Sequence, residues 1–310
     1  MLSSLQSEKK RRELNEKLIK YTLILAAAIS ILTTFGILFS ILFEAIEFFQ
    51  LRSFWYFLTG TIWSPGVANS QFGALPIFAG TFVITIIALL VAIPIGLGSA
   101  IYMSEYASPK FRDYLKPILE ILAGIPTVVY GFFAAITVAP LVVKAAAFFG
   151  LEATFNSALA SGIVMGIMII PLISSLSDDV IRAVPDSQRK AAFALGMTHG
   201  ETIKNIVIPS AMPGIISASL LALSRALGET MIVVMAAGLR PNLSWNPLED
   251  MTTVTVTIVN SLVGDFEFNS PETLSAFALG LVLFIVTLIL NMISLSIIRK
   301  FKEKYKVNTL

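Results

Sequence analysis

The sequence contains no cysteine and a single histidine, His199. This disfavours disulfide frameworks, thiolate nucleophiles, zinc or haem sites built from His and Cys, and a Ser/His/Asp triad. No Gly-Lys pair occurs, so the phosphate-binding loop of a P-loop ATPase is also missing. Charge is scarce, because only 14% of the 310 residues are Asp, Glu, Lys or Arg, against about 25% in soluble domains. The net charge of +2 gives no indication of nucleic-acid binding.

Long apolar runs are abundant, and 56% of the residues are hydrophobic. Four runs without charge are each long enough to cross a bilayer, which takes about 20 residues. Two further spans come from longer stretches: one follows a break at Ser64, Pro65 and Gly66, and the other contains Arg225 and Glu229. We therefore expect an all-α integral membrane protein with six transmembrane helices. They are predicted at about residues 21–43, 74–102, 119–143, 154–177, 214–239 and 274–298.

The distribution of basic residues predicts the orientation of these spans. Of the 22 Lys and Arg residues, 18 lie in the two tails (1–20 and 299–310) and in the second and fourth loops. Because Lys and Arg concentrate in cytoplasmic segments, both termini of the six-span domain (21–298) are expected in the cytoplasm. The acidic loop at about 240–272 is then extracytoplasmic. The basic N-terminal tail could also bind anionic lipid, although topology alone explains its charge.

The fourth loop, residues 178–212, is the most informative segment. Its sequence predicts a short helix that ends at Gly196, and Thr198 with Glu201 has the spacing of a capping box that opens a second helix. Pro209 is expected to end this second helix. Two such short helices cannot span a membrane. The apolar side chains expected to form a face that needs a partner are Phe193, Leu195, Ile203 and Ile206.

This loop resembles the EAA loop of the permease subunits of bacterial ABC importers, whose pattern is E-A-A-x3-G-x9-I-x-L-P. The matching positions are Ala191, Ala192, Gly196, Ile206 and Pro209. Two positions depart from the pattern, since Lys190 replaces the family's Glu and Ile208 its Leu. The resemblance implies that these residues, together with Glu201, couple the chain to a separate ATPase. The departure at Lys190 leaves the charge pairing of the family's Glu open.

Two more segments resemble the C-type permease of the phosphate-specific importer. They are Ala-Gly-Ile-Pro-Thr-Val-Val-Tyr-Gly at 123–131 and Ser-Arg-Ala-Leu-Gly-Glu-Thr-Met at 224–231. The resemblance implies a type I ABC importer permease fold in a bacterial inner membrane, forming half of a path for inorganic phosphate. It further implies a sister permease, two ATPase subunits that bind the ATP, an extracytoplasmic phosphate-binding protein and no cofactor of the chain's own. A molybdate or sulfate permease, in which Phe-Gly follows a similar R-A-L-G-E, is the alternative.

Arg225 and Glu229 are the only charges expected at depth in a span. Each is costly there, by about 2.5 to 3.5 kcal/mol, unless it faces a partner or water. Spaced four residues apart, they would share one face of a helix and could simply neutralise each other. Our hypothesis is that they line the path of the transported anion, with Ser224 and Thr230 as weaker candidates, because guanidinium matches a tetrahedral oxyanion.

Two other features have less specific interpretations. Asp178 and Asp179 suggest the metal-binding pair of a membrane transferase, but their position predicts a solvated helix end and no metal site. His199 is expected to be a solvated loop residue, because one histidine has no partners for a metal. A polytopic membrane enzyme and a secondary transporter are the alternatives from other classes. Only one span carries charges at depth, and no inverted repeat is evident. Neither the membrane enzyme nor the secondary transporter is favoured by these two observations.

Overall fold

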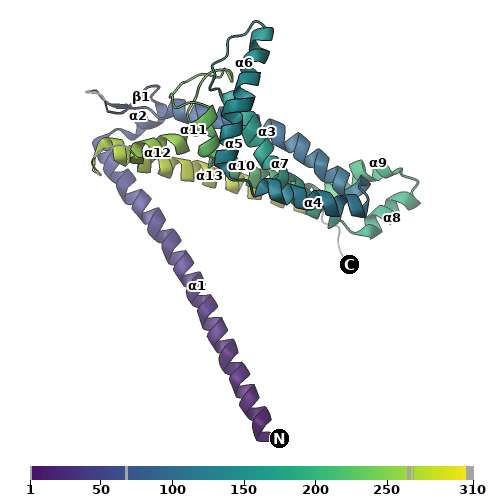
Figure 1. Ribbon diagram of the computed structural model, residues 1–310. Coiled ribbons are helices and arrows are strands. Elements are labelled where there is room, and N and C mark those ends of the chain that lie inside the picture. Colours follow the sequence, from purple (N-terminus) through teal and green to yellow (C-terminus); the bar gives the residue numbers. More distant parts are fainter. Residues whose placement is uncertain (1, 67–68, 264–266, 268, 305–310) are drawn as a thin grey trace.

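The computed structural model describes residues 2–66, 69–263, 267 and 269–304, and its architecture is almost entirely helical (Figure 1). Within this part of the chain, six helices are long and apolar enough to cross a membrane. They are Asn15–Leu51, Leu75–Tyr106, Thr127–Phe148, Ala158–Arg182, His199–Leu227 and Pro271–Lys300. The expectation of an all-α fold with six membrane spans is confirmed.

The spans contain helices α1 (Leu2–Leu51), α3 (Leu75–Ile101), α5 (Thr127–Phe133), α6 (Ala139–Phe148), α7 (Ala158–Arg182), α10 (Ile208–Leu227) and α13 (Pro271–Lys304). Shorter helices are α2 (Phe54–Thr59), α4 (Pro109–Ala123), α8 (Asp186–Ala194), α9 (His199–Thr202), α11 (Met231–Ala236) and α12 (Val254–Val263). Strands β1 (Trp63–Ser64) and β2 (Gln71–Phe72) form an antiparallel hairpin. Three π-helical turns extend or join helices: η1 (Tyr102–Tyr106) follows α3, η2 (Ala134–Val138) joins α5 to α6, and η3 (Ile203–Val207) joins α9 to α10.

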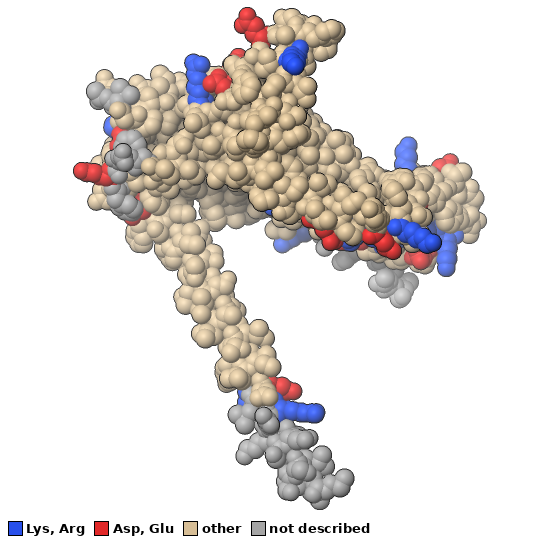
Figure 2. Space-filling view, in the orientation of Figure 1, with Lys and Arg blue, Asp and Glu red and all other residues tan. Residues whose placement is uncertain are grey.

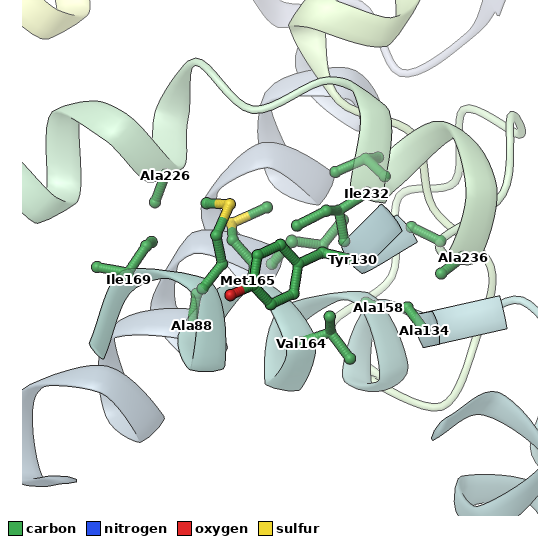
Figure 3. Packing of buried hydrophobic residues seen from close by; sticks show 14 of the residues in the cluster. Ala88, Tyr130, Ala134, Ala158, Val164, Met165, Ile169, Ala226, Ile232 and Ala236 are labelled. Carbon is green, nitrogen blue, oxygen red and sulfur yellow. The ribbon is translucent and has the colours of Figure 1, made fainter. Parts of the chain in front are cut away.

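The central core forms where α3 and α7 pack along each other and receive side chains from α5, α10 and α11. Figure 3 shows Met165 of α7 in this cluster, with Tyr130 and Ile232 on one side and Ile169 on the other, toward Ala226. Close packing of α3 and α7 depends on small residues. A Cβ atom added at Gly166 would lie 2.8 Å from the Ala88 carbonyl oxygen, so the two backbones approach closely only with glycine there.

A second cluster covers the end of the bundle that carries the hairpin. Phe48 of α1 packs edge-on against Phe57 and Phe72, and Trp63 joins them. The aromatic residues of this segment are therefore mostly packed among themselves, whereas Trp55 is 73% exposed. Most of α1 extends away from the rest of the chain (Figure 1). The C-terminal part of α1 contacts the N-terminal part of α13.

The third span starts later than the expected 119–143. Helix α4 ends at Ala123 and α5 begins at Thr127, so the chain is broken between them. The break has a local cause: Pro126 has no N–H to donate and disfavours helical geometry at Ile125. The span therefore runs through Thr127–Phe148, and α4 is a separate amphipathic helix that packs on α7.

The fifth span also differs from the expected 214–239. Its helix ends at Leu227, and the short α11 begins only at Met231. The residues between them include Gly228, whose low helix propensity favours a break at this position. At its other end the continuous helical segment reaches back to His199, beyond the expected start of the span. Arg225 and Glu229 consequently do not lie on one continuous helix, and the expectation that they share a helix face was wrong.

Charged side chains gather at the ends of the molecule, and an uncharged band separates them (Figure 2). Helices α4, α8 and α9 lie at one end of the bundle, and α13 finishes near them (Figure 1). The opposite end carries the hairpin and α12. This arrangement matches a bilayer whose headgroup regions lie at the two ends, with the basic loop containing α8 and α9 on one side.

The orientation predicted from the basic residues has a direct test. A reporter fused at Leu310 is expected to report the cytoplasm, whereas the same reporter inserted near Asn246 is expected to report the opposite side. Alkaline phosphatase and green fluorescent protein activities of the two fusions measure this. Identical localisation of the two fusions would contradict the six-span topology.

Candidate functional site

The loop between the fourth and fifth spans forms a helix–turn–helix. Helix α8 ends in a Schellman motif, in which the Met197 N–H donates to the Ala192 carbonyl oxygen at 3.1 Å and Gly196 has φ +82°. Helix α9 starts with the expected capping box: the Thr198 N–H donates to the Glu201 carboxylate at 2.8 Å, and the Glu201 N–H donates back to the Thr198 hydroxyl. Both local predictions are confirmed.

The side of this helix–turn–helix that faces away from the helical bundle is exposed. Phe193 is 46% and Leu195 82% exposed, as expected of a face that needs a partner, and Lys190 also faces outward. Ile203, in contrast, is buried, because it packs within the chain where η3 begins. The unpartnered apolar face is therefore narrower than the sequence predicted, and it centres on α8 and its turn.

Pro209 lies where the sequence predicted a helix end, but the helix continues through it. In the π-helical turn η3, the Ile208 N–H donates to the Ile203 carbonyl oxygen, five residues back. This wider turn brings Pro209 into the first turn of α10, where a missing N–H is tolerated. Helix α9 is thus joined to the fifth span by an uninterrupted helical segment, and the expectation that Pro209 ends the helix was wrong.

An ion pair that the sequence did not reveal joins α8 to η1, the π-helical turn that follows α3. The Arg189 guanidinium donates to the Glu105 carboxylate at 2.9 Å and to the Ile181 carbonyl oxygen at 3.0 Å. Both side chains are largely buried. The loop is therefore held by charge-assisted hydrogen bonds to α7 and to the π-helical end of α3.

His199 belongs to the same cluster. Its ring stacks on Phe193 at a centroid distance of 6.3 Å and meets Tyr106 edge-on at 5.2 Å. Its Nε2 atom lies 3.9 Å from the Glu105 carboxylate. His199 is 47% exposed, so it is partly solvated as expected but also joins α9 to α8 and to η1.

The interpretation of Asp178 as a solvated residue was wrong. Asp178 is 1% exposed, and its carboxylate accepts from Arg112 of α4 at 2.8 Å. Asp179 pairs with Lys116, also on α4, at 3.0 Å. The two aspartates therefore fasten α4 to α7. Within the described part of the chain, no group of three or more acidic, His or Cys residues is arranged to hold a metal.

Glu229 and Arg225 separate at the break of the fifth span. Glu229 is 9% exposed, and its carboxylate accepts hydrogen bonds from the backbone N–H groups of Thr230 and Met231, at 3.0 and 2.9 Å, where α11 begins. A carboxylate is stabilising at such a position, because the first N–H groups of a helix have no partner within it. Arg225, in the last turn of α10, is exposed. No ion pair joins the two side chains among the residues that the structure describes.

Arg225 lines a cavity of about 220 Å³ at the junction of α4, α7 and α10. Its lining residues are Leu119, Glu120, Ala123, Met168, Pro171, Leu172, Ser175, Leu176 and Arg225. The walls are largely apolar, with one guanidinium and one carboxylate among them. This is the composition expected of a site that orients a small charged ligand through a few polar groups.

The weaker candidates for the path, Ser224 and Thr230, flank this region without lining the cavity. The Ser224 hydroxyl donates to the Asn291 side chain of α13 at 3.4 Å, and Thr230 lies at the start of α11, where its N–H is bound by Glu229. Thr255 donates to the Glu229 carbonyl oxygen at 2.7 Å and so supports the same break. Sequence patterns give no indication of these contacts.

The fold and the two sites define a multi-pass membrane protein with an exposed helix–turn–helix at one face and a charged cavity among its spans, as in a transport permease. Residues 92–306 match the family model described as "Binding-protein-dependent transport system inner membrane component". Because the match covers more than half of the sequence, the chain belongs to this family.

Relatives cover most of the chain. The "Phosphate transport system permease protein PstC" of Mesorhizobium japonicum is 34% identical, over 86% of this chain and 84% of its own length. The "Probable ABC transporter permease protein YqgH" of Bacillus subtilis is 35% identical, over 81% of this chain and 78% of its own. "Phosphate transport system permease protein PstC 1" of Mycobacterium tuberculosis is 32% identical, over 79% and 82%.

The fold is also found in a solved structure. A chain of a bacterial alginate ABC transporter, solved in complex with a periplasmic protein bound to alginate pentasaccharide, superimposes with a TM-score of 0.62. The superposition covers 91% of this chain and 94% of that chain at 14% sequence identity. At this identity the likeness concerns the fold alone, which is that of an ABC importer permease.

Proposed function

We propose that this chain is a transmembrane subunit of an ATP-driven importer of inorganic phosphate and forms half of its translocation path. The observation that carries the proposal is the exposed Arg225 side chain, which lines a cavity between α4 and the spans α7 and α10 and makes no ion pair within the described residues. A charged side chain within a membrane-spanning helix is costly unless it serves a ligand or water. The relatives named as phosphate transport permeases supply the identity of the anion.

Arg225 is the group that binds the anion in this proposal. Its planar fork of donors matches the oxygens of a tetrahedral oxyanion and forms short, charge-assisted hydrogen bonds with them. Glu229 has a different role, because its carboxylate is bound to the backbone N–H groups of α11. It stabilises the break in the fifth span and thereby positions Arg225 at the helix end. Ser224 and Thr230 flank the path and are secondary contacts.

The helix–turn–helix couples the chain to its ATPase. The residues proposed to contact or shape that interface are Lys190, Ala191, Ala192, Gly196, Glu201, Ile206 and Pro209. A displacement of α8 reaches the spans by two routes. One is the ion pair between Arg189 and Glu105, and the other is the continuous helical path from α9 into α10.

The partners in this proposal are a sister permease, two ATPase subunits that bind the ATP, and an extracytoplasmic phosphate-binding protein. The chain has no Gly-Lys pair for a P-loop. The proposal therefore assigns ATP binding and hydrolysis to the ATPase subunits and includes no cofactor held by this chain. Surrounding lipid covers the exposed apolar surface that no protein partner covers.

The function is tested by reconstitution of the chain with a sister permease and ATPase subunits encoded beside it. Vesicles that hold the complex are expected to accumulate labelled phosphate only with ATP and the binding protein, and affinity purification of this chain is expected to retain the ATPase. Uptake of sulfate or molybdate in place of phosphate would assign another oxyanion. Uptake without the ATPase would contradict the importer and indicate a secondary transporter.

A further inference from the structure

Glu120 faces the same cavity as Arg225, although the two residues lie far apart in the sequence. Glu120 occupies the last turn of α4, and Arg225 the last turn of α10. Apart from the hydroxyl of Ser175, the other side chains of the lining are apolar. The cavity therefore presents one carboxylate and one guanidinium to whatever occupies it.

Neither of these two charges is neutralised within the described part of the chain. Arg225 and Glu120 make no ion pair with each other or with a third residue, and neither makes a side-chain hydrogen bond. Two opposite charges that line one cavity without contact leave space for a ligand between them. The volume of about 220 Å³ is sufficient for a small oxyanion, since one water molecule takes about 30 Å³.

The remaining contacts of α4 fasten the helix that carries Glu120. Arg112 and Lys116 of this helix are paired with Asp178 and Asp179 of α7, and the Arg112 pair is nearly buried. These bonds fasten α4 against the helix that forms the opposite wall of the cavity. Glu120 lies on this fastened helix, one turn beyond Lys116, and lines the cavity from there.

Glu229 is the carboxylate that the sequence places beside Arg225, but the structure uses it elsewhere. It accepts three backbone N–H groups at the start of α11, at distances from 2.9 to 3.4 Å. All three bonds go to Oε1, so this oxygen is committed to the start of α11, and Glu229 does not line the cavity. Glu120 is the acidic side chain that shares the cavity with Arg225.

We propose that Glu120 determines the specificity for phosphate by accepting a hydrogen bond from its protonated oxygen, while Arg225 binds the unprotonated oxygens. An ionised carboxylate only accepts hydrogen bonds. Phosphate near neutral pH carries an O–H that can donate to it, whereas sulfate has none and is repelled by the second negative charge. This inference rests on the proposed import of phosphate and adds a residue that selects between oxyanions.

The test is Glu120→Gln in the assembled, reconstituted complex. Glutamine keeps the size of the side chain, removes its charge and adds an N–H donor that suits sulfate. The ratio of phosphate to sulfate affinity, measured on the complex without its binding protein, is expected to fall by about tenfold or more, which corresponds to one charge-assisted hydrogen bond. Glu120→Asp, which keeps the carboxylate, is expected to retain a preference for phosphate.

Asp113→Asn is the matched control. Asp113 is an exposed carboxylate two turns earlier on the same face of α4 and does not line the cavity, so its neutralisation is expected to leave the ratio unchanged. An unchanged ratio in Glu120→Gln would overturn the role of Glu120, as would failure of both Glu120 variants to assemble. If Arg225→Gln still imports phosphate at the normal rate, the proposed path itself fails. This result separates a failure of the path from a failure of the role of Glu120 alone.

Discussion

Gly196→Val is expected to abolish ATP-driven uptake while the protein stays inserted in the membrane. Gly196 has φ +82°, in the left-handed region, and its N–H closes the end of α8 onto the Phe193 carbonyl oxygen. A β-branched residue is strained there by about 1 to 3 kcal/mol, so the turn between α8 and α9 should open or shift. Nothing lies within 4 Å of a Cβ atom at this position, so the effect would come from the backbone and not from crowding.

Two variants control for other causes. Gly196→Asn is expected to retain most uptake, because asparagine tolerates the left-handed region. Gly200→Val adds the same bulk in the same loop at a glycine without a positive φ and with open space around it, and a much smaller loss is expected. Uptake, membrane content and ATPase retention on affinity purification are measured for each variant. Normal uptake by Gly196→Val would contradict the coupling role of this turn.

Arg225→Gln is expected to lower phosphate uptake by at least about 100-fold in a complex that still assembles. Among the described residues, the guanidinium is the one cationic side chain that lines the cavity, and hydrogen bonds to charged groups contribute roughly 1.5 to 3 kcal/mol each. Arg225→Lys is expected to restore uptake only in part, because ammonium lacks the planar fork. Initial rates of labelled phosphate uptake at several concentrations measure the effect.

Arg240→Gln is the matched control, because Arg240 is an exposed arginine outside the spans and does not line this cavity. Its uptake should remain near that of the unmodified complex. Glu229→Gln tests the separate role of the break, and a partial loss is expected, since the glutamine oxygen can still accept from the N–H groups of α11. Recovery of normal transport in the double variant of Arg225 and Glu229 would show that neither charge is needed for transport.

Several features follow from the sequence because their causes are local. The long uncharged runs predict helices that cross a bilayer, since helical backbone satisfies its own hydrogen bonds there. Thr198 and Glu201 predict a helix start, and Gly196 predicts a helix end, because these hydrogen bonds join residues within one or two turns. The break before Thr127 could have been foreseen from Pro126 and its restriction of the preceding residue.

The tertiary structure alone decided which charges meet. Arg189 reaches Glu105 across 84 positions of the sequence, and Arg112 reaches Asp178 across 66. It also turned Glu229 toward the backbone of α11 and placed Glu120 beside the cavity of Arg225. Periodicity and spacing describe neighbours along a helix, but a contact between distant residues depends on the path of the chain and on the packing of its helices. The sequence by itself therefore determined the number of spans and the turn between α8 and α9, whereas only packing assigned each buried charge its partner.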